Sequence, residues 1–271
     1  MIDKTFVKKS FNAGAATYDD NAALQRRLLE GLLAFANCGN LQPQRILDIG
    51  IGTGSLSARL AAMFPRAQVC GCDLAENMLL RARGKSAATG LRLFAADAES
   101  LPLEASCCEL AASSFTLQWL NSLDMAMHEA LRVLRPGGLF FFAVFGAHTF
   151  QELRECFYQA CSETGYDQGD AFAVPHTRAS ADEALRRAGF ASAATESLKI
   201  IEWYDSVAGL ARAIKGMGAR NASPRRNRTP GVRRIWRRMA ELYETRYGRG
   251  GRIPATYEVI MGRAVRPRQA V

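Results

Sequence analysis

The stretch Arg45-Ile46-Leu47-Asp48-Ile49-Gly50-Ile51-Gly52-Thr53-Gly54-Ser55-Leu56 decides the fold. Its apolar first part predicts a short buried strand, the alternating glycines predict a turn, and a helix is expected to begin near Ser55. A strand that runs into a glycine turn and then a helix is where an open α/β sheet holds a nucleotide-like ligand, because glycine lets the backbone approach that ligand closely.

The spacing of the three glycines separates the possible ligands. The dinucleotide fingerprint is G-x-G-x-x-G, whereas Gly54 comes one position early and Ser55 stands where the third glycine belongs. Asp48 precedes Gly50 by two residues, and a carboxylate beside the loop suits S-adenosylmethionine, which lacks a pyrophosphate and carries a sulfonium and an ammonium group. The loop alone favours this methyl donor and leaves a dinucleotide site or a plain tight turn as alternatives.

Length and composition indicate one large domain. The 271 residues, 48% of them hydrophobic, fit a single α/β domain over 1–271. We divide it into a helical N-terminal lid (1–42), a donor-binding core (43–146) and a substrate and cap region (147–271). No secretory signal or membrane-spanning run is visible. Seven cysteines without framework spacing favour a reducing, cytoplasmic compartment and indicate no metal site.

Strands and helices alternate along the chain. Strands are predicted over 46–49, 68–72, 91–95, 110–115 and 139–145, with intervening helices over 56–63, 77–83 and 123–134. Two helices are expected within 4–39, the second over 18–35. Later segments predict helices opened by capping boxes at Thr149–Glu152 and Ser180–Glu183, helices from 207 and over 232–247, and strands over 195–203 and 255–265. Residues 223–231 read as a loop.

This order predicts a Rossmann-like class I methyltransferase fold. It implies a seven-stranded, mostly parallel sheet with helices on both faces, a helical N-terminal segment and a helical insertion before the last strand.

Two further acids follow predicted strands. Asp73 and Asp97 stand at the ends of the second and third strands, and ligand contacts in a parallel sheet come from these carboxyl ends. Asp73 can accept both ribose hydroxyls, and Asp97 can accept from the adenine amine. Each is also a plausible helix cap on its own. Together with the loop, these acids predict a donor site that includes the following Leu74 and Ala98.

Aromatic residues follow the fourth strand. Phe115 and Trp119 are candidates to pack on the adenine or to wall the acceptor pocket, and ordinary core packing is the alternative. The sequence contains no Asn-Pro-Pro-Tyr motif, and its absence disfavours N-methylation of DNA or of protein amides.

Several motifs together resemble one family. They are Phe11-Asn12-Ala13-Gly14-Ala15-Ala16-Thr17-Tyr18-Asp19, Leu24-Gln25, Leu117-Gln118-Trp119, Leu134-Arg135-Pro136-Gly137-Gly138, the segment 150–157, Lys215-Gly216-Met217-Gly218-Ala219 and Tyr257. Over nearly the whole chain they look like malonyl-acyl-carrier-protein O-methyltransferases of biotin synthesis. The resemblance implies methylation of the free carboxylate of a malonyl thioester, giving an ester that primes pimeloyl synthesis. One departure is Ile51, where a smaller residue, often Cys, is expected.

This reaction needs alignment more than acid or base chemistry. A malonyl carboxylate is ionised at neutral pH, so no catalytic base is expected. A cation should select the carboxylate, with Arg preferred for its fork geometry. Trp119 is also expected to contact the substrate. The candidate cations are Arg220, Arg252, Lys215 and His148, and the alternative for each is a solvated surface residue. Tyr18 is expected to lie over the donor as part of a lid, with helix packing as its alternative.

Positive charge gathers in the last quarter of the chain. The net charge is +9, and residues 199–271 hold 17 Lys and Arg against 5 Asp and Glu. Such a field attracts an anionic partner. The predicted partner is malonyl-loaded acyl carrier protein, docked on Arg225, Arg226, Arg228, Arg233, Arg234, Arg237 and Arg238. A solvated surface is the alternative, and nucleic acid is disfavoured because interleaved aromatics are lacking.

Two other functions remain open at this point. One is a methyltransferase of the same fold that acts on another small carboxylate or a quinone precursor. The other is a protein that keeps the donor site but hydroxylates or assembles a protein partner.

Overall fold

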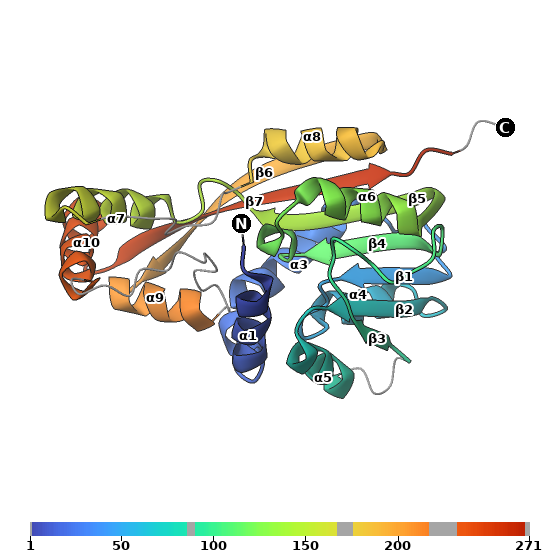
Figure 1. Cartoon of the computed structure of the whole chain (residues 1–271), viewed down its shortest axis with the longest axis horizontal. Coiled ribbons are helices and arrows are strands. Elements are labelled where there is room, and N and C mark those ends of the chain that lie inside the picture. Colours follow the sequence, from blue (N-terminus) through green and yellow to red (C-terminus); the bar gives the residue numbers. More distant parts are fainter. Residues whose placement is uncertain (1, 86–89, 167–175, 217–231, 269–271) are drawn as a thin grey trace.

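Seven strands form one sheet in the computed structural model, which describes residues 2–85, 90–166, 176–216 and 232–268 (Figure 1). The strands are β1 (Arg45–Ile49), β2 (Gln68–Asp73), β3 (Arg92–Ala95), β4 (Cys108–Ser114), β5 (Leu134–Phe145), β6 (Ala191–Tyr204) and β7 (Ile253–Val265). Their order across the sheet is β3-β2-β1-β4-β5-β7-β6. β7 runs antiparallel to β5 and β6, and the remaining pairs are parallel. The predicted fold class is confirmed.

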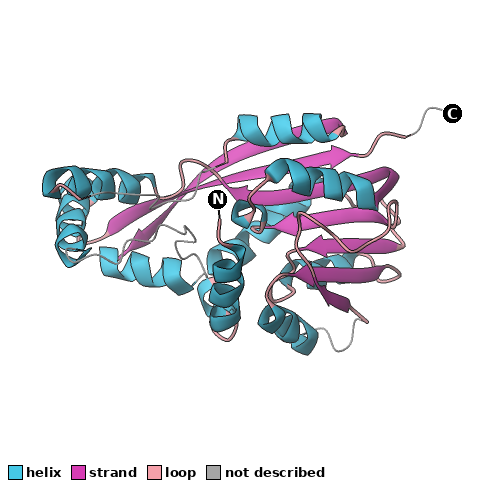
Figure 2. Ribbon diagram, viewed as in Figure 1, coloured by secondary structure: helices cyan, strands magenta, loops and turns pink. Residues whose placement is uncertain are grey.

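Helices cover both faces of the sheet (Figure 2). They are α1 (Lys4–Gly14), α2 (Tyr18–Asn21), α3 (Ala23–Ala36), α4 (Ser55–Met63), α5 (Glu76–Lys85), the 3-10 turn η1 (Leu117–Trp119), α6 (Leu123–Val133), α7 (Gln151–Thr164), α8 (Arg178–Ala188), α9 (Val207–Gly216) and α10 (Val232–Tyr247). The insertion before the last strand consists, in the described part, of α9 and α10.

The inner strand β5 contributes side chains to the core on both faces of the sheet. Phe140 and Phe142 pack on one side with buried residues of α6 and α8. Phe141, between them, packs on the other side with buried residues of α3 and α4. Successive side chains of a strand point to opposite faces, so a strand covered on both sides is apolar throughout. This explains the continuous apolar run that marks β5 in the sequence.

The antiparallel pair of β6 and β7 extends beyond the rest of the sheet. Pairing continues from Ala191↔Val265 to Tyr204↔Ile253, and Figure 1 shows the far end of this strand pair beside α7, α9 and α10. A separate apolar cluster joins these elements, including Tyr243 of α10 and Tyr257 of β7. The last part of the chain therefore builds its own core on strands that belong to the main sheet.

Three local predictions were wrong in detail. The expected helix over 18–35 is interrupted at Ala22, whose φ of −95° and ψ of 26° separate α2 from α3. The Thr149–Glu152 pair does not cap α7. Thr149 Oγ1 donates to the carbonyl oxygen of Glu258 at 3.1 Å, and the Glu152 carboxylate accepts from the backbone and hydroxyl of Thr256. Both side chains of the expected capping box thus form hydrogen bonds with β7 and are not used to cap α7.

The second capping box begins one turn earlier than expected. Ser180 N donates to Thr177 Oγ1 at 3.0 Å, and Thr177 N donates to Ser180 Oγ at 2.9 Å. Gly189 ends α8 in the left-handed conformation. The expected loop over 223–231 lies outside the described residues.

No helix in the described part of the chain is long and apolar enough to cross a membrane. The seven cysteines carry free thiols, and the described residues hold no cluster of three or more metal-binding side chains.

Candidate active site

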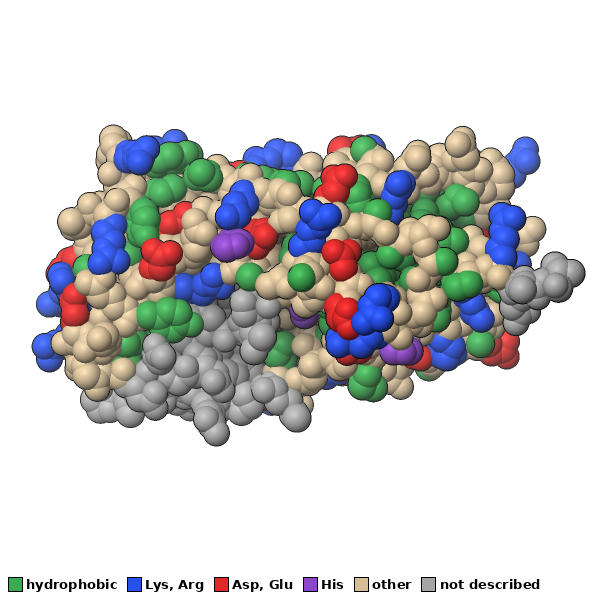
Figure 3. All heavy atoms as spheres, turned by 90° about the horizontal axis from the view of Figure 1, so that it is seen from above, with side chains coloured by type: hydrophobic (Ala, Val, Ile, Leu, Met, Phe, Trp, Pro, Cys, Tyr) green, Lys and Arg blue, Asp and Glu red, His purple; other side chains and the backbone are tan. Residues whose placement is uncertain are grey.

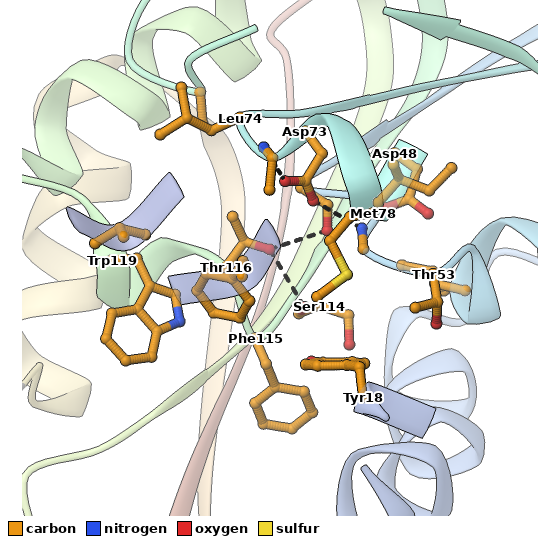
Figure 4. Close-up of a pocket in the computed structure, with 18 of the residues that line it drawn as sticks. Tyr18, Asp48, Thr53, Asp73, Leu74, Met78, Ser114, Phe115, Thr116 and Trp119 are labelled. Atoms are coloured by element: carbon orange, nitrogen blue, oxygen red, sulfur yellow. Dashed lines mark hydrogen bonds between the residues drawn. The ribbon is translucent and has the colours of Figure 1, made fainter. Parts of the chain in front are cut away.

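A pocket opens at the carboxyl ends of β1, β2, β3 and β4, under the N-terminal helices (Figure 4). The glycine loop after β1 forms its floor. Gly50 has a φ of +74°, and a Cβ atom there would lie 2.1 Å from Thr116 Oγ1. The Thr116 hydroxyl itself donates to the Gly50 carbonyl oxygen at 3.0 Å. Glycine is therefore required both for its backbone angle and for the close approach of the loop after β4.

Gly54 has a different role from Gly50 and Gly52. It does not line the pocket but precedes α4 with a φ of +85°, and its α-carbon faces Ala82 of α5, where a Cβ atom would lie 3.3 Å away. The other residues expected at the donor site all line the pocket: Tyr18, Asp48, Gly50, Gly52, Asp73, Leu74, Asp97, Ala98 and Phe115.

Asp48 is a buried acid at the end of β1. It is 1% exposed and accepts a hydrogen bond from Ser57 Oγ at 2.7 Å. Burial raises its pKa to about 7, and the nearby Asp73 carboxylate adds to that shift. A positively charged ligand beside Asp48 would favour its ionised form.

Asp73 holds the glycine loop from the end of β2. Its Oδ2 accepts from Gly52 N at 2.9 Å, and its Oδ1 accepts from Ala75 N at 2.8 Å (Figure 4). Burial raises the pKa of this carboxyl despite those hydrogen bonds. The backbone N–H of Leu74 also donates to this carboxylate, and since a carboxylate has about four acceptor positions, it can still accept from a hydroxyl donor in the pocket.

Asp97 is joined to the N-terminal helix. Lys4 Nζ of α1 lies 2.5 Å from Asp97 Oδ2 and also pairs with Glu99. Asp97 Oδ1 accepts from the backbone N–H of Glu99 at 3.0 Å. This ion pair brings α1 to the end of β3.

Aromatic side chains enclose the pocket. The Phe11 ring of α1 meets Trp119 edge-on, with 5.5 Å between ring centres, and lies 6.3 Å from Tyr18. Tyr18 is partly buried, and desolvation, with the nearby Asp73 and Asp19 carboxylates, raises its pKa to about 12. Figure 4 shows Tyr18, Phe115 and Trp119 around the same cavity. The N-terminal helices therefore close over the strand ends and shield them from water.

Comparison with known proteins agrees with this geometry. Residues 47–142 match the family model described as "Methyltransferase domain". The malonyl-acyl-carrier-protein O-methyltransferase of Geobacter sulfurreducens is 41% identical over 266 residues, covering 97% of this chain and 98% of that protein. The enzyme of the same name from Laribacter hongkongensis is 40% identical and covers 98% of this chain and 90% of its own. The chain belongs to the malonyl-acyl-carrier-protein O-methyltransferase family.

More distant structures share only the fold. The YcgJ protein of Bacillus subtilis aligns with a TM-score of 0.62 at 16% identity, covering 90% of this chain and 99% of its own. Phosphoethanolamine N-methyltransferase 2 of Haemonchus contortus, solved with S-adenosylhomocysteine, aligns with a TM-score of 0.63 at 18% identity. That alignment covers 99% of this chain and 61% of the nematode enzyme.

Of the described residues expected to bind the substrate, only one lines the pocket. Trp119 lines the pocket, whereas the described candidates Lys215, Arg252 and His148 do not. Arg252 is exposed and donates to the carbonyl oxygen of Trp203 at 2.8 Å. The side chain of His148 is exposed, and Lys215 is exposed at the end of α9. The fourth candidate, Arg220, lies outside the described residues.

Sequence reasoning missed the polar residues that the N-terminal helices bring to the pocket. These are Lys4, Lys8, Gln25 and Arg26. The spacing of Lys4, Val7, Lys8 and Phe11 places them on one face of a helix, and this signal was available in the sequence. Nothing in the local sequence shows, however, that this face packs over the strand ends.

No described residue of α10 lines the pocket, and Figure 1 shows this helix beside α7 at the far end of β6 and β7. Arg233, Arg234 and Arg237 are exposed, on the side opposite the buried Ile235 and Met239. Arg238 instead pairs with Glu163 of α7 at 2.5 Å and with Glu241. Figure 3 shows Lys and Arg side chains along the left edge of the molecule, where α7 and α10 lie. The expected Arg225, Arg226 and Arg228 fall outside the described residues.

Proposed function

We propose that this chain transfers a methyl group from S-adenosylmethionine to the free carboxylate of a malonyl thioester on acyl carrier protein. The product is the malonyl methyl ester that primes pimeloyl synthesis for biotin. The observation that carries this proposal is the enclosed pocket in which Asp48, Asp73 and Asp97 end three neighbouring strands under an aromatic lid. Family membership supports the acceptor and does not favour a quinone precursor or a protein substrate.

The residues of the pocket fit the donor. Asp73 lines the pocket and can accept a hydrogen bond from the ribose hydroxyls, and Asp97 offers its carboxylate near Ala98, where an adenine amine can donate. Asp48 sits behind the glycine loop, where its negative charge favours a cationic ligand. Tyr18, Leu74, Met78 and Phe115 supply apolar surface to the same cavity.

The chain itself needs only to align the reactants and exclude water. When bound, S-adenosylmethionine would supply a methyl group on a positively charged sulfur, which a carboxylate oxygen of the acceptor would displace in line. The malonyl carboxylate is already ionised at neutral pH, so no side chain has to remove a proton. The rings of Phe11, Phe115 and Trp119 keep water from competing and restrict the approach of the acceptor. We place Trp119 at the acceptor side of the pocket.

We further propose that acyl carrier protein docks on the exposed arginines of α10, Arg233, Arg234 and Arg237, together with Arg225, Arg226 and Arg228. Supporting this, α10 buries Ile235 and Met239 and presents these arginines to solvent. Complementary charge raises the rate of encounter with an acidic partner and makes binding sensitive to salt. The reaction would take place in the cytoplasm, in agreement with the free thiols.

Methyl transfer from labelled S-adenosylmethionine to three acceptors tests the proposed reaction. Malonyl-carrier protein should yield a base-labile methyl ester, whereas acetyl-carrier protein, which has no free carboxylate, should yield none. The rate with malonyl-coenzyme A, compared with the rate with malonyl-carrier protein, shows how strongly the enzyme recognises the carrier protein itself. If no malonyl thioester is esterified, or if acetyl-carrier protein is methylated equally well, the proposed acceptor is wrong.

A further inference from the structure

Gln25 of α3 lines the pocket and carries a buried, unsatisfied hydrogen-bond acceptor. The residue is 8% exposed. Within the described residues its Oε1 atom has no hydrogen-bond partner. A buried amide oxygen without a donor is destabilising, and such groups in folded proteins usually find a partner. A ligand with an N–H group in this part of the pocket would supply one.

Arg26, the next residue, lines the pocket without an ion pair to a described carboxylate. Lys4 pairs with Asp97 and Glu99, and Lys8 pairs with Glu76 at 2.8 Å. Arg26 lines the same pocket but forms no ion pair with any described residue. One of its nitrogens donates to the carbonyl oxygen of Asp19.

The Asp19 carboxylate attracts Arg26 without forming an ion pair with it, because other groups contact its oxygens directly. Thr53 Oγ1 donates to its Oδ1 at 2.6 Å, and Lys85 Nζ lies 2.6 Å from its Oδ2. A guanidinium has five N–H donors, so Arg26 keeps donors for an anionic ligand.

The start of α3 lies beside the glycine loop and the start of α4. Asp19 connects the two, because it contacts Thr53 through its carboxylate and Arg26 through its carbonyl oxygen. Gly54 is the N-cap of α4 and supplies no side-chain hydrogen bond. The Ser57 N–H already donates to the Asp48 carboxylate, and the other N–H groups of the first turn, together with the helix dipole, favour negative charge. A carboxylate between Arg26 and α4 would therefore be held from both sides.

We infer that Gln25 and Arg26 together recognise the amino-acid end of the methyl donor. The Gln25 amide oxygen accepts a hydrogen bond from the donor's ammonium group, and the Arg26 guanidinium binds its carboxylate. The adjacent acceptor and cation match an ammonium and a carboxylate that share one carbon atom. This inference rests on the proposed function, since it assigns residues to its donor.

Binding of two related ligands by calorimetry tests the inference. S-adenosylhomocysteine carries the amino-acid chain, whereas methylthioadenosine has the same adenosine and sulfur without it. Gln25→Met and Arg26→Gln should each weaken S-adenosylhomocysteine about tenfold, the loss expected for a hydrogen bond to a charged group. Both variants should bind methylthioadenosine as the parent does. Gln25→Glu, which keeps an acceptor, should retain more affinity for S-adenosylhomocysteine than Gln25→Met.

The neighbouring Arg27 offers a matched control. It lies on the same helix, pairs with Glu202 and does not line the pocket, so Arg27→Gln should leave both affinities unchanged. Equal loss of both ligands would mean that the variants distort the pocket, and the inference would be wrong. Unchanged affinity for S-adenosylhomocysteine with a raised KM for malonyl-carrier protein would assign Arg26 to the acceptor instead. The two calorimetric affinities do not depend on ester formation, so failure of the proposed reaction remains distinguishable from failure of this inference.

Discussion

The Lys4 ammonium of α1 lies 2.5 Å from Oδ2 of Asp97, at the end of β3. These residues are far apart in the sequence, and the contact fastens the N-terminal helix over the strand ends. Lys8 adds a second ion pair with Glu76 of α5, and Asn12 receives a hydrogen bond from Asn77 N at 2.9 Å. α1 thus covers the pocket through polar contacts with two neighbouring elements.

Removing the Lys4 charge should loosen this cover. Lys4→Met leaves Asp97 and Glu99 without their cation, and a partly exposed ion pair contributes about 1 kcal/mol. We expect S-adenosylhomocysteine to bind about fivefold more weakly and protease to cleave the N-terminal segment faster. Lys9→Met, on the exposed side of the same helix, should change neither quantity. Equal behaviour of the two variants would contradict the role given to Lys4.

Asp48 should make stability depend on pH. Its folded-state pKa of about 7 lies above its ordinary value of 3.8, so the folded state binds its proton more tightly than the unfolded state. The free energy of unfolding should therefore fall as pH rises between these two values, by at most about 4 kcal/mol.

Asp48→Asn should remove this dependence. Urea unfolding of the unliganded protein at about pH 5 and about pH 8 should show a smaller difference for the variant than for the parent. The variant should also bind the cationic donor less well, because its negative charge is lost. The exposed Glu104→Gln serves as control, and an unchanged pH dependence in Asp48→Asn would refute the prediction.

Gly71 makes room for Ile51, the residue that departs from the family pattern. A Cβ atom on Gly71 would lie 2.3 Å from Ile51 Cδ1. Gly71→Ala should destabilise the protein by about 2 kcal/mol through overpacking. Adding Ile51→Val, which removes that methyl group, should restore part of the loss, so that the two changes are not additive. Gly31→Ala, where a Cβ meets open space, is the control, and additive losses at 51 and 71 would exclude this packing relation.

Charge reversal on α10 tests the docking surface. Arg233→Glu with Arg237→Glu should raise the KM for malonyl-carrier protein about tenfold at low salt and less at high salt, because exposed charges are screened. The KM for malonyl-coenzyme A and the affinity for S-adenosylhomocysteine should stay the same. Arg66→Glu with Arg92→Glu, at exposed positions distant from α10 in the sequence, provides a control of equal charge. Equal effects of both pairs would remove α10 from the docking surface.

The strand ends of the donor site were predictable because their signals are local. Apolar runs followed by Asp73 or Asp97 identify the ends of β2 and β3, and parallel strands bring such ends to one edge of the sheet. The first capping box failed for the opposite reason. Thr149 and Glu152 have the right spacing for a cap, but the partners on β7 that they bind lie more than 100 residues later.

The sequence by itself determined the methyl-donor loop, the parallel core and the family, because glycine spacing and alternating apolar segments act over a few residues. Only the tertiary structure decided which face of α1 and α3 meets the pocket, and hence the places of Lys4, Gln25 and Arg26. It also showed that Lys215, Arg252 and His148 lie outside the pocket lining. The physical reason is that these positions depend on how distant segments pack together. That packing is stabilised by burial of apolar surface between them, and a local sequence pattern does not show which surfaces will meet.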